Sequence, residues 1–243
     1  MEPFGLAIAA AGLFLAGIIK GATGLGYASC ALPFLVLSIG LKPAMAIVLA
    51  PAIATNITLV VTTGYLKETA ARFYPMYLAM VPGIAAGLAM LLWVDQAVAT
   101  KVLGGVILFY VAFAMARPQF ALGANLRQPL QAPAGFLNGI ITGLTGSQVV
   151  PLLPYVMSLQ LDADRTVQAI NIGVIVSTVV LSLGLYLSGI LTVTLAAGSL
   201  AAIVPALIGT SIGVSVRRMI SVARFRKVVL FTLLGIGVLM ILK

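Results

Sequence analysis

Residues 17–24 read Gly17-Ile18-Ile19-Lys20-Gly21-Ala22-Thr23-Gly24, and 122 residues later the chain reads Gly139-Ile140-Ile141-Thr142-Gly143-Leu144-Thr145-Gly146, identical at six of eight positions. Such internal similarity indicates a duplicated structural unit. We therefore predict two related halves, residues 1–117 and 131–243, joined by a linker at residues 118–130. After a one-residue deletion, further matches pair Pro33 with Pro154, Phe34 with Tyr155 and Tyr65 with Tyr186.

The composition is that of a membrane protein. Of the 243 residues, 62% are hydrophobic and only 8% are charged, against roughly 25% charged residues in a soluble domain. The mean hydropathy is +1.20. A helix needs about 20 apolar residues to cross a bilayer, and the uncharged stretch 166–216 is long enough for two such helices, with Ser188-Gly189 as the turn. The sequence predicts an all-α polytopic protein with about 8–10 membrane segments in a bacterial-type inner membrane.

The net charge of +9 reflects the excess of Lys and Arg that membrane proteins carry in their cytoplasmic loops. It therefore does not indicate a nucleic-acid partner. The single cysteine, Cys30, and the absence of histidine from the sequence leave little with which to hold a metal ion. We expect no cofactor, no metal site and no nucleic-acid binding. Membrane lipid and a small substrate are the partners that remain.

Each half opens with an apolar region that its glycine motif interrupts, residues 3–41 in the first half and 131–161 in the second. A continuous helix of about 37 residues would extend roughly 55 Å, whereas the hydrocarbon core is roughly 30 Å thick. Each opening must therefore enter the membrane, break at the glycines and return. The two arms either cross fully or form a re-entrant pair.

The positive charges test this arrangement. With returning openings, eleven Lys and Arg residues gather on one side and three on the other, which is a strong positive-inside bias. Single-crossing openings would give five against eight, with Lys20 inside the membrane. The first arrangement places both termini outside the cytoplasm and makes the halves an inverted repeat. Its larger group contains Lys20, Lys67, Arg72, Arg117, Arg127, Arg165, Arg217, Arg218, Arg224, Arg226 and Lys227, and its smaller group contains Lys42, Lys101 and Lys243.

Inverted repeats with interrupted helices indicate a binding site near the membrane midplane. A break frees backbone groups that lipid cannot satisfy, and helix N-termini there attract anions. The glycines also fit the alternative of close helix packing, and the polar residues of the neighbouring helices fit hydrogen bonding between helices. The predicted substrate-binding residues are Lys20, Gly21, Thr23, Gly24, Gly26, Tyr27, Asn56, Gly143, Thr145, Gly146, Ser147, Gln148 and Asn171.

Lys20 directly precedes the first break and has two interpretations. A lysine inside the membrane indicates a functional site, whereas a lysine near a helix end can extend to the membrane surface. The acidic residues Glu2, Glu68, Asp95, Asp162 and Asp164 all lie at predicted helix ends or in loops. The sequence therefore argues against proton coupling through carboxylates.

These motifs resemble those of the TauE/SafE sulfite exporters, also called the TSUP family of anion permeases. The resemblance rests on Gly17 to Gly26 running into Leu32-Pro33, on the repeat running into Leu153-Pro154, and on the basic pair Arg217-Arg218. It implies transport of sulfite, sulfonates or related sulfur-containing anions. The residues themselves predict only a small anion in a site between two related breaks.

We therefore expect a secondary carrier that alternates access by moving one half against the other. An anion channel is the first alternative, because broken helices also form pores. A membrane-embedded enzyme is the second, but the sequence offers no histidine and no intramembrane acid from which to build a catalytic group.

Overall fold

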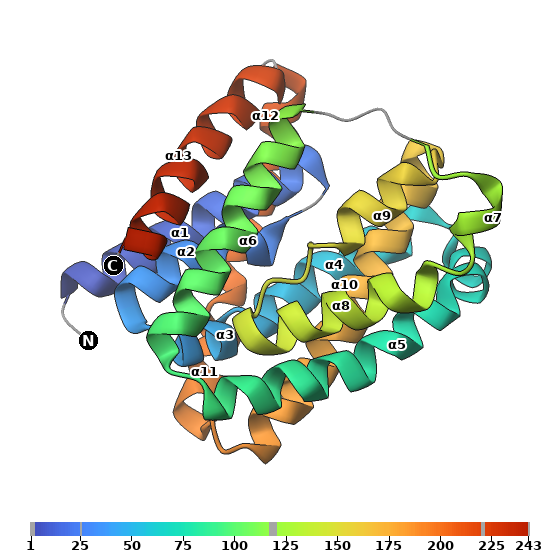
Figure 1. The fold of residues 1–243 in the computed structure, drawn as a ribbon. Coiled ribbons are helices and arrows are strands. Elements are labelled where there is room, and N and C mark those ends of the chain that lie inside the picture. Colours follow the sequence, from blue (N-terminus) through green and yellow to red (C-terminus); the bar gives the residue numbers. More distant parts are fainter. Residues whose placement is uncertain (1–2, 25, 117–120, 220–221, 243) are drawn as a thin grey trace.

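A computed structural model describes residues 3–24, 26–116, 121–219 and 222–242, and these residues form helices and loops without any strand. Figure 1 shows the helices as one bundle. In chain order they are α1 (Pro3–Thr23), α2 (Tyr27–Ile39), α3 (Leu41–Ile47), α4 (Leu49–Thr63), α5 (Leu66–Trp93), α6 (Gln96–Ala116), α7 (Ala124–Arg127), α8 (Gln131–Thr145), α9 (Leu152–Ser158), α10 (Ala163–Leu187), α11 (Val193–Ala201), α12 (Ile203–Met219) and α13 (Val222–Leu242).

Within the described residues, five helical stretches are long and apolar enough to cross a membrane. They are Leu41–Thr63, Leu66–Trp93, Gln96–Ala116, Ala163–Leu187 and Val193–Ser215, and shorter apolar helices accompany them. The prediction of an all-helical polytopic protein is confirmed at this level. The uncharged stretch 166–216 covers all but the first three residues of Ala163–Leu187 and the whole of Val193–Ser215, with Gly189 in the left-handed region (φ 73°) at the turn between them.

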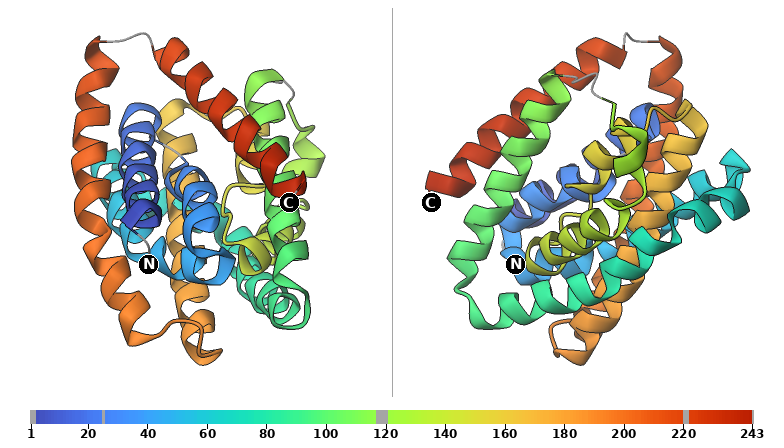
Figure 2. Two further views of the ribbon diagram at one scale, coloured as in Figure 1. Left: turned by 90° about the vertical axis from the view of Figure 1, so that its left-hand side faces the viewer. Right: turned by 45° about the vertical axis from the view of Figure 1, so that its right-hand side comes forward.

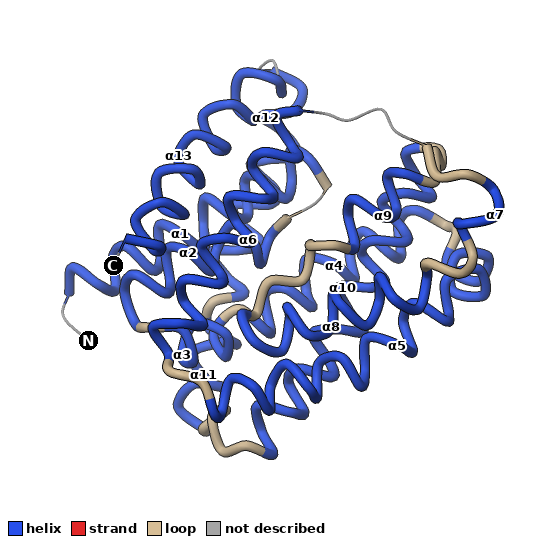
Figure 3. The backbone as a smooth tube through the Cα atoms, in the orientation of Figure 1, coloured by secondary structure: helices blue, strands red, loops and turns tan. Residues whose placement is uncertain are grey.

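Both openings are broken helices. The first break lies between Thr23 and Tyr27 and the second between Thr145 and Leu152; Figure 3 shows the second as a loop through the middle of the bundle. At 1.5 Å per residue, the 13 residues of α2 and the 7 of α9 extend only about 20 Å and about 10 Å, less than the roughly 30 Å of hydrocarbon. The returning arms are therefore too short to cross the core as straight helices.

Glycines allow two pairs of helices to pack backbone against backbone. A Cβ atom added to Gly21 of α1 would lie 2.1 Å from the Thr210 carbonyl oxygen of α12, and one added to Gly143 of α8 would lie 2.3 Å from the Ile84 oxygen of α5. Because real Cβ atoms do not approach so closely, these positions require glycine. Figure 2 shows α12 beside α1 and α5 beside α8. The packing interpretation therefore holds for Gly21 and Gly143, which the sequence assigned to the substrate site.

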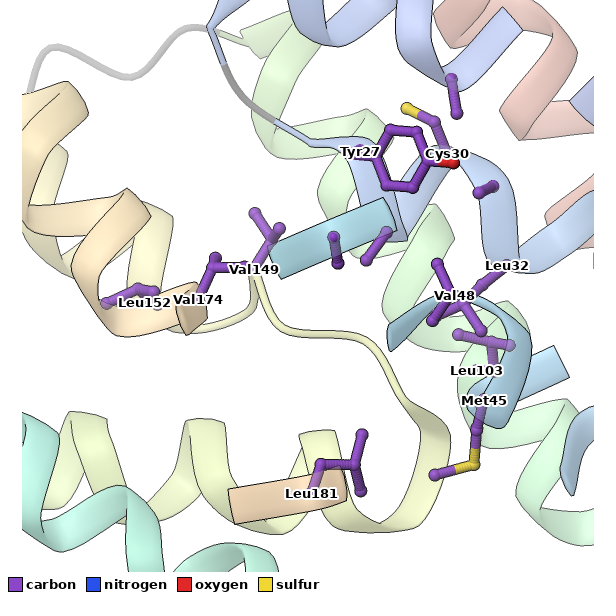
Figure 4. Packing of buried hydrophobic residues seen from close by; sticks show 14 of the residues in the cluster. Tyr27, Cys30, Leu32, Met45, Val48, Leu103, Val149, Leu152, Val174 and Leu181 are labelled. Carbon is purple, nitrogen blue, oxygen red and sulfur yellow. The ribbon is translucent and has the colours of Figure 1, made fainter. Parts of the chain in front are cut away.

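A hydrophobic core joins the two halves of the chain. One cluster contains Leu32, Met45 and Leu103 from the first half and Leu152 and Leu181 from the second, all of them fully buried and all labelled in Figure 4. Further contacts between the halves pair α10 with both α4 and α5, and α13 with α6. The halves are interlocked rather than separate bodies.

The charged residues lie at the ends of the helices. Gly40, Gln96 and Met240 line one groove, which places the neighbourhoods of Lys42 and Lys101 at the same end of the molecule. At another end, Arg165 binds Glu68 (2.9 Å) and Asp162 (2.6 Å). Arg117 and Lys243 lie outside the described residues, as do the side chains of Arg217, Arg218, Arg224, Arg226 and Lys227.

Asp162 begins α10, as the sequence predicts. Its carboxylate accepts a hydrogen bond from the backbone N–H of Arg165 at 2.8 Å, and this bond, together with the Arg165 side chain, holds the pKa of Asp162 below its ordinary value. The acid therefore caps a helix at the exposed end and is not part of the membrane interior.

Gly87→Ala tests the backbone packing of α5 against α8. The added methyl would lie 2.1 Å from the Ile140 oxygen, and overpacking of this kind costs about 1–3 kcal/mol. We expect a lower midpoint of thermal unfolding for the purified protein in detergent. Gly105→Ala, also within a helix but with no atom within 4 Å of the new methyl, is the control and should leave the midpoint unchanged or slightly raised. Equal midpoints for the two variants would contradict the packing.

Candidate functional site: a buried lysine between two helix breaks

Lys20 lies in the last turn of α1, immediately before the first break. Its side chain is only 2% exposed, and its Nζ donates hydrogen bonds to Asn56 Oδ1 at 2.7 Å and to Asn171 Oδ1 at 2.5 Å. The alternative in which this lysine extends to the membrane surface is therefore wrong. The amine is held inside the protein because α4 and α10 supply acceptors that the sequence around Lys20 does not reveal.

The two asparagine amides are oriented by their own helices. Asn56 Nδ2 donates to the Ala52 carbonyl at 2.6 Å, and Asn171 Nδ2 donates to the Val167 carbonyl at 2.7 Å. Since both amide nitrogens are engaged with backbone oxygens one turn earlier, both amide oxygens face the lysine. One acceptor comes from each half of the chain, so Lys20 connects the two.

A small cavity lies beside Lys20 and is bounded by residues of both breaks. Its volume is about 10 Å³, roughly the space that one water molecule needs. We call it the central cavity. Figure 4 labels Tyr27, Val149 and Val174, three of the residues around it. Its complete lining is Lys20, Gly26, Tyr27, Ala28, Asn56, Gln148, Val149, Leu153, Ile170 and Val174.

Two residues of this lining carry buried polar atoms that have no hydrogen-bond partner among the described residues. Gln148 Nε2 donates to Thr178 Oγ1 at 2.8 Å, but its Oε1 accepts nothing. The Tyr27 hydroxyl is also buried without a partner. Buried polar groups of this kind are uncommon in native proteins and indicate a functional site or bound water.

Other predicted site residues shape the breaks without lining the cavity. Thr23 donates to the Ile19 carbonyl (2.8 Å) and Thr145 to the Ile141 carbonyl (2.6 Å), each within its own helix. The Ser147 N–H donates to Thr145 Oγ1 at 3.2 Å. Gly24 and Gly146 adopt φ of 77° and 76°, a conformation that favours glycine.

The structure therefore brings together part of the predicted set. Lys20, Gly26, Tyr27, Asn56 and Gln148 line the central cavity, Asn171 binds the lysine, and the Gly24 carbonyl accepts from Asn171 at 3.4 Å. Gly21 and Gly143 do not belong to the lining, because they pack against α12 and α5. Sequence reasoning missed the apolar members Ala28, Val149, Leu153, Ile170 and Val174, which carry no polar signal in an apolar chain, and Thr178, the partner of Gln148.

A second, larger groove of about 390 Å³ lies next to α9. We call it the basic groove, because its lining contains Arg72 and Arg127 and no carboxylate. Tyr155 of α9 lines this groove, whereas Leu153, two residues earlier, lines the central cavity. The short helix α9 is thus common to both. The groove is formed by Ala71, Arg72, Phe73, Tyr74, Pro75, Ala124, Arg127, Gln128, Gln131, Tyr155 and Leu159.

A family model described as Sulfite exporter TauE/SafE matches residues 8–240, nearly the whole chain. The chain belongs to the TauE/SafE sulfite exporter family. Members of this family are multi-pass membrane transporters of anions, so this TauE/SafE protein is a transporter and not an enzyme. Searches among curated proteins and among solved structures found no significant match.

Asn171→Asp tests whether the amine of Lys20 is available to an anion in this TauE/SafE protein. The new carboxylate would give the lysine a permanent partner and would repel a second anion, so we expect the affinity for sulfite to fall at least about tenfold, or about 1.4 kcal/mol. Binding is measured by isothermal titration of the purified protein. Gln96→Glu makes the same amide-to-acid change at the exposed start of α6 and should bind sulfite normally. Unchanged affinity in Asn171→Asp would show that the amine of Lys20 does not contact the anion.

Proposed function

We propose that the protein carries a small sulfur-containing anion, sulfite or a sulfonate, across the cell membrane by alternating access, with Lys20 as its cationic contact. One observation supports this most strongly. The Lys20 amine is buried between the two breaks with two neutral amide oxygens as its hydrogen-bond acceptors. The sulfur chemistry of the substrate comes from the family.

An anion is the ligand that this environment favours. A buried ammonium needs compensation, and amide oxygens supply only partial charge. The first turn of α2 also lines the cavity through Tyr27 and Ala28, so the positive end of a helix dipole faces the same space. Lysine, helix terminus and the glycine backbone together favour a compact anion over a cation or a neutral solute.

The closed cavity favours a carrier over a channel. A space of about one water molecule cannot hold sulfite, so the observed state is occluded and the site must open to load. The basic groove is separated from this cavity by α9, whose residues Leu153 and Tyr155 face the two spaces. We propose that displacement of α9 opens the site on the side of the basic groove.

The moving units in this proposal are not the two sequence halves. Backbone packing through glycines ties α1 of the first half to α12 of the second, and α8 of the second half to α5 of the first. The opening helix of each half, α1 or α8, thus packs against a helix of the other half, α12 or α5. This matching arrangement supports the proposal of an inverted repeat. We therefore propose that α1, α2 and α12 move as one unit against α5, α8 and α9.

Sulfite efflux from proteoliposomes tests the function. Lys20→Gln should lower the rate of efflux about 10- to 100-fold, because a hydrogen bond to a charged group contributes about 1.5–3 kcal/mol. Lys101→Gln, at an exposed position of α6, is the matched control and should leave the rate unchanged. A carrier predicts flux that saturates with sulfite and is competed by a sulfonate.

Two results would contradict this proposal. Wild-type rates in Lys20→Gln would show that the lysine does not contact the substrate. Sustained single-channel currents in planar bilayers would favour the channel.

The orientation of the chain is a further part of the proposal. Since Lys20 is buried, the positive-inside comparison becomes ten residues against three, which still supports an orientation with both termini outside the cytoplasm. In a Cys30→Ser background, Lys42→Cys should react with an impermeant thiol reagent added to intact cells, and Arg127→Cys should react only after the membrane is permeabilised. The opposite pattern would contradict the orientation.

A further inference from the structure

We infer that Lys20 gains a proton when the anion binds and loses it when the anion leaves, so that the protein moves one proton together with each anion. This inference rests on the proposed function, because it requires that Lys20 contact the transported anion. It begins from the surroundings of Lys20 in the occluded state.

No negative charge faces Lys20 from the described residues of the elements around it. Its two acceptors on α4 and α10 are neutral amides. The titratable side chains nearest to the first break are Tyr27 and Cys30 on α2 and Tyr110 on α6, all of them neutral in their ordinary state. The charged residues in the sequences of α12 and α13 are all basic, so neither helix contributes a carboxylate that could pair with the amine.

The acidic residues of the described structure are engaged elsewhere. Glu68 and Asp162 bind Arg165 at an exposed end, and Asp95 accepts a hydrogen bond from the Ala97 N–H at the start of α6. Asp164 is exposed. In the occluded state the amine of Lys20 therefore has no carboxylate partner, and the central cavity is too small to admit an anion as a substitute.

The hydrogen bonds of Lys20 match a neutral amine. An NH₂ group has two N–H donors, and the two amide oxygens accept both of them. An NH₃⁺ group has a third donor, for which the described residues offer no acceptor in the occluded state, and it would bring an uncompensated charge into the protein interior. The neutral form is therefore favoured when the site is empty.

Anion binding reverses this preference. An anion in the enlarged cavity accepts the third N–H and compensates the charge, so that it favours protonation of the amine. By linkage, protonation then favours anion binding by the same factor. The loaded site carries one anion and one proton, and the proton leaves to water with the anion. The empty site returns with a neutral lysine, so a singly charged anion crosses without net movement of charge.

Equilibrium accumulation in proteoliposomes distinguishes this coupling from transport of the anion alone. The probe is radiolabelled methanesulfonate, which keeps a single negative charge across the working pH range. Potassium with valinomycin clamps the membrane potential while the pH gradient is varied, and the potential is then varied without a pH gradient. Protein-free vesicles correct for leakage.

One-to-one coupling predicts that the accumulation ratio changes about tenfold per pH unit of gradient and does not change with potential. A ratio that changes about tenfold per 59 mV of potential and ignores the pH gradient would overturn the inference while leaving the transporter intact. If the protein does not carry methanesulfonate, sulfite transport by the Lys20→Arg variant distinguishes the same two alternatives.

Lys20→Arg provides this second readout, because an arginine keeps its charge at all working pH values. The site of this variant can therefore change the side to which it opens only when a bound anion compensates the charge of the arginine. We expect exchange of internal for external sulfite to persist while net efflux into sulfite-free buffer falls at least about tenfold. Equal loss of exchange and net efflux in a folded variant, or unchanged net efflux, would overturn the inference. If the wild type carries neither anion under any gradient, the proposed function itself fails.

Discussion

An amine buried away from both lipid and bulk water constrains much of this structure. Lys20 requires acceptors, and it finds them on α4 and α10, helices from different halves of the chain. Both asparagine amides are turned toward it by bonds to their own backbones. The site is thus held by groups that satisfy the lysine without neutralising a positive charge, which leaves that role to a ligand.

The breaks beside Lys20 depend on helices that approach closely. Gly21 and Gly143 bring α1 and α8 against the backbones of α12 and α5, while Gly24, Gly26 and Gly146 let the chain turn a few residues later. The same short motif therefore fixes each helix against a neighbour and ends it at the centre of the protein. This arrangement explains how irregular backbone is sheltered from lipid.

Much of this architecture could be predicted from the sequence. Uncharged stretches located the spans, and the duplicated motif located the two breaks within a few residues. The different uses of the glycines could not be predicted, because Gly21 and Gly24 differ only in their tertiary surroundings. The burial of Lys20 depends on Asn171, 151 residues away in the chain, and Val149 or Leu153 cannot be distinguished by residue type from other apolar residues of the membrane core.

The position of a bound anion tests the central claim most directly. Selenite replaces the sulfur of sulfite with a heavier element of the same charge and geometry, and its anomalous scattering can be located in crystals of the protein. The account predicts a selenium peak between the two breaks, with a selenite oxygen within about 3 Å of Lys20 Nζ. A peak in the basic groove at Arg72 and Arg127, with none beside Lys20 at saturating selenite, would contradict it.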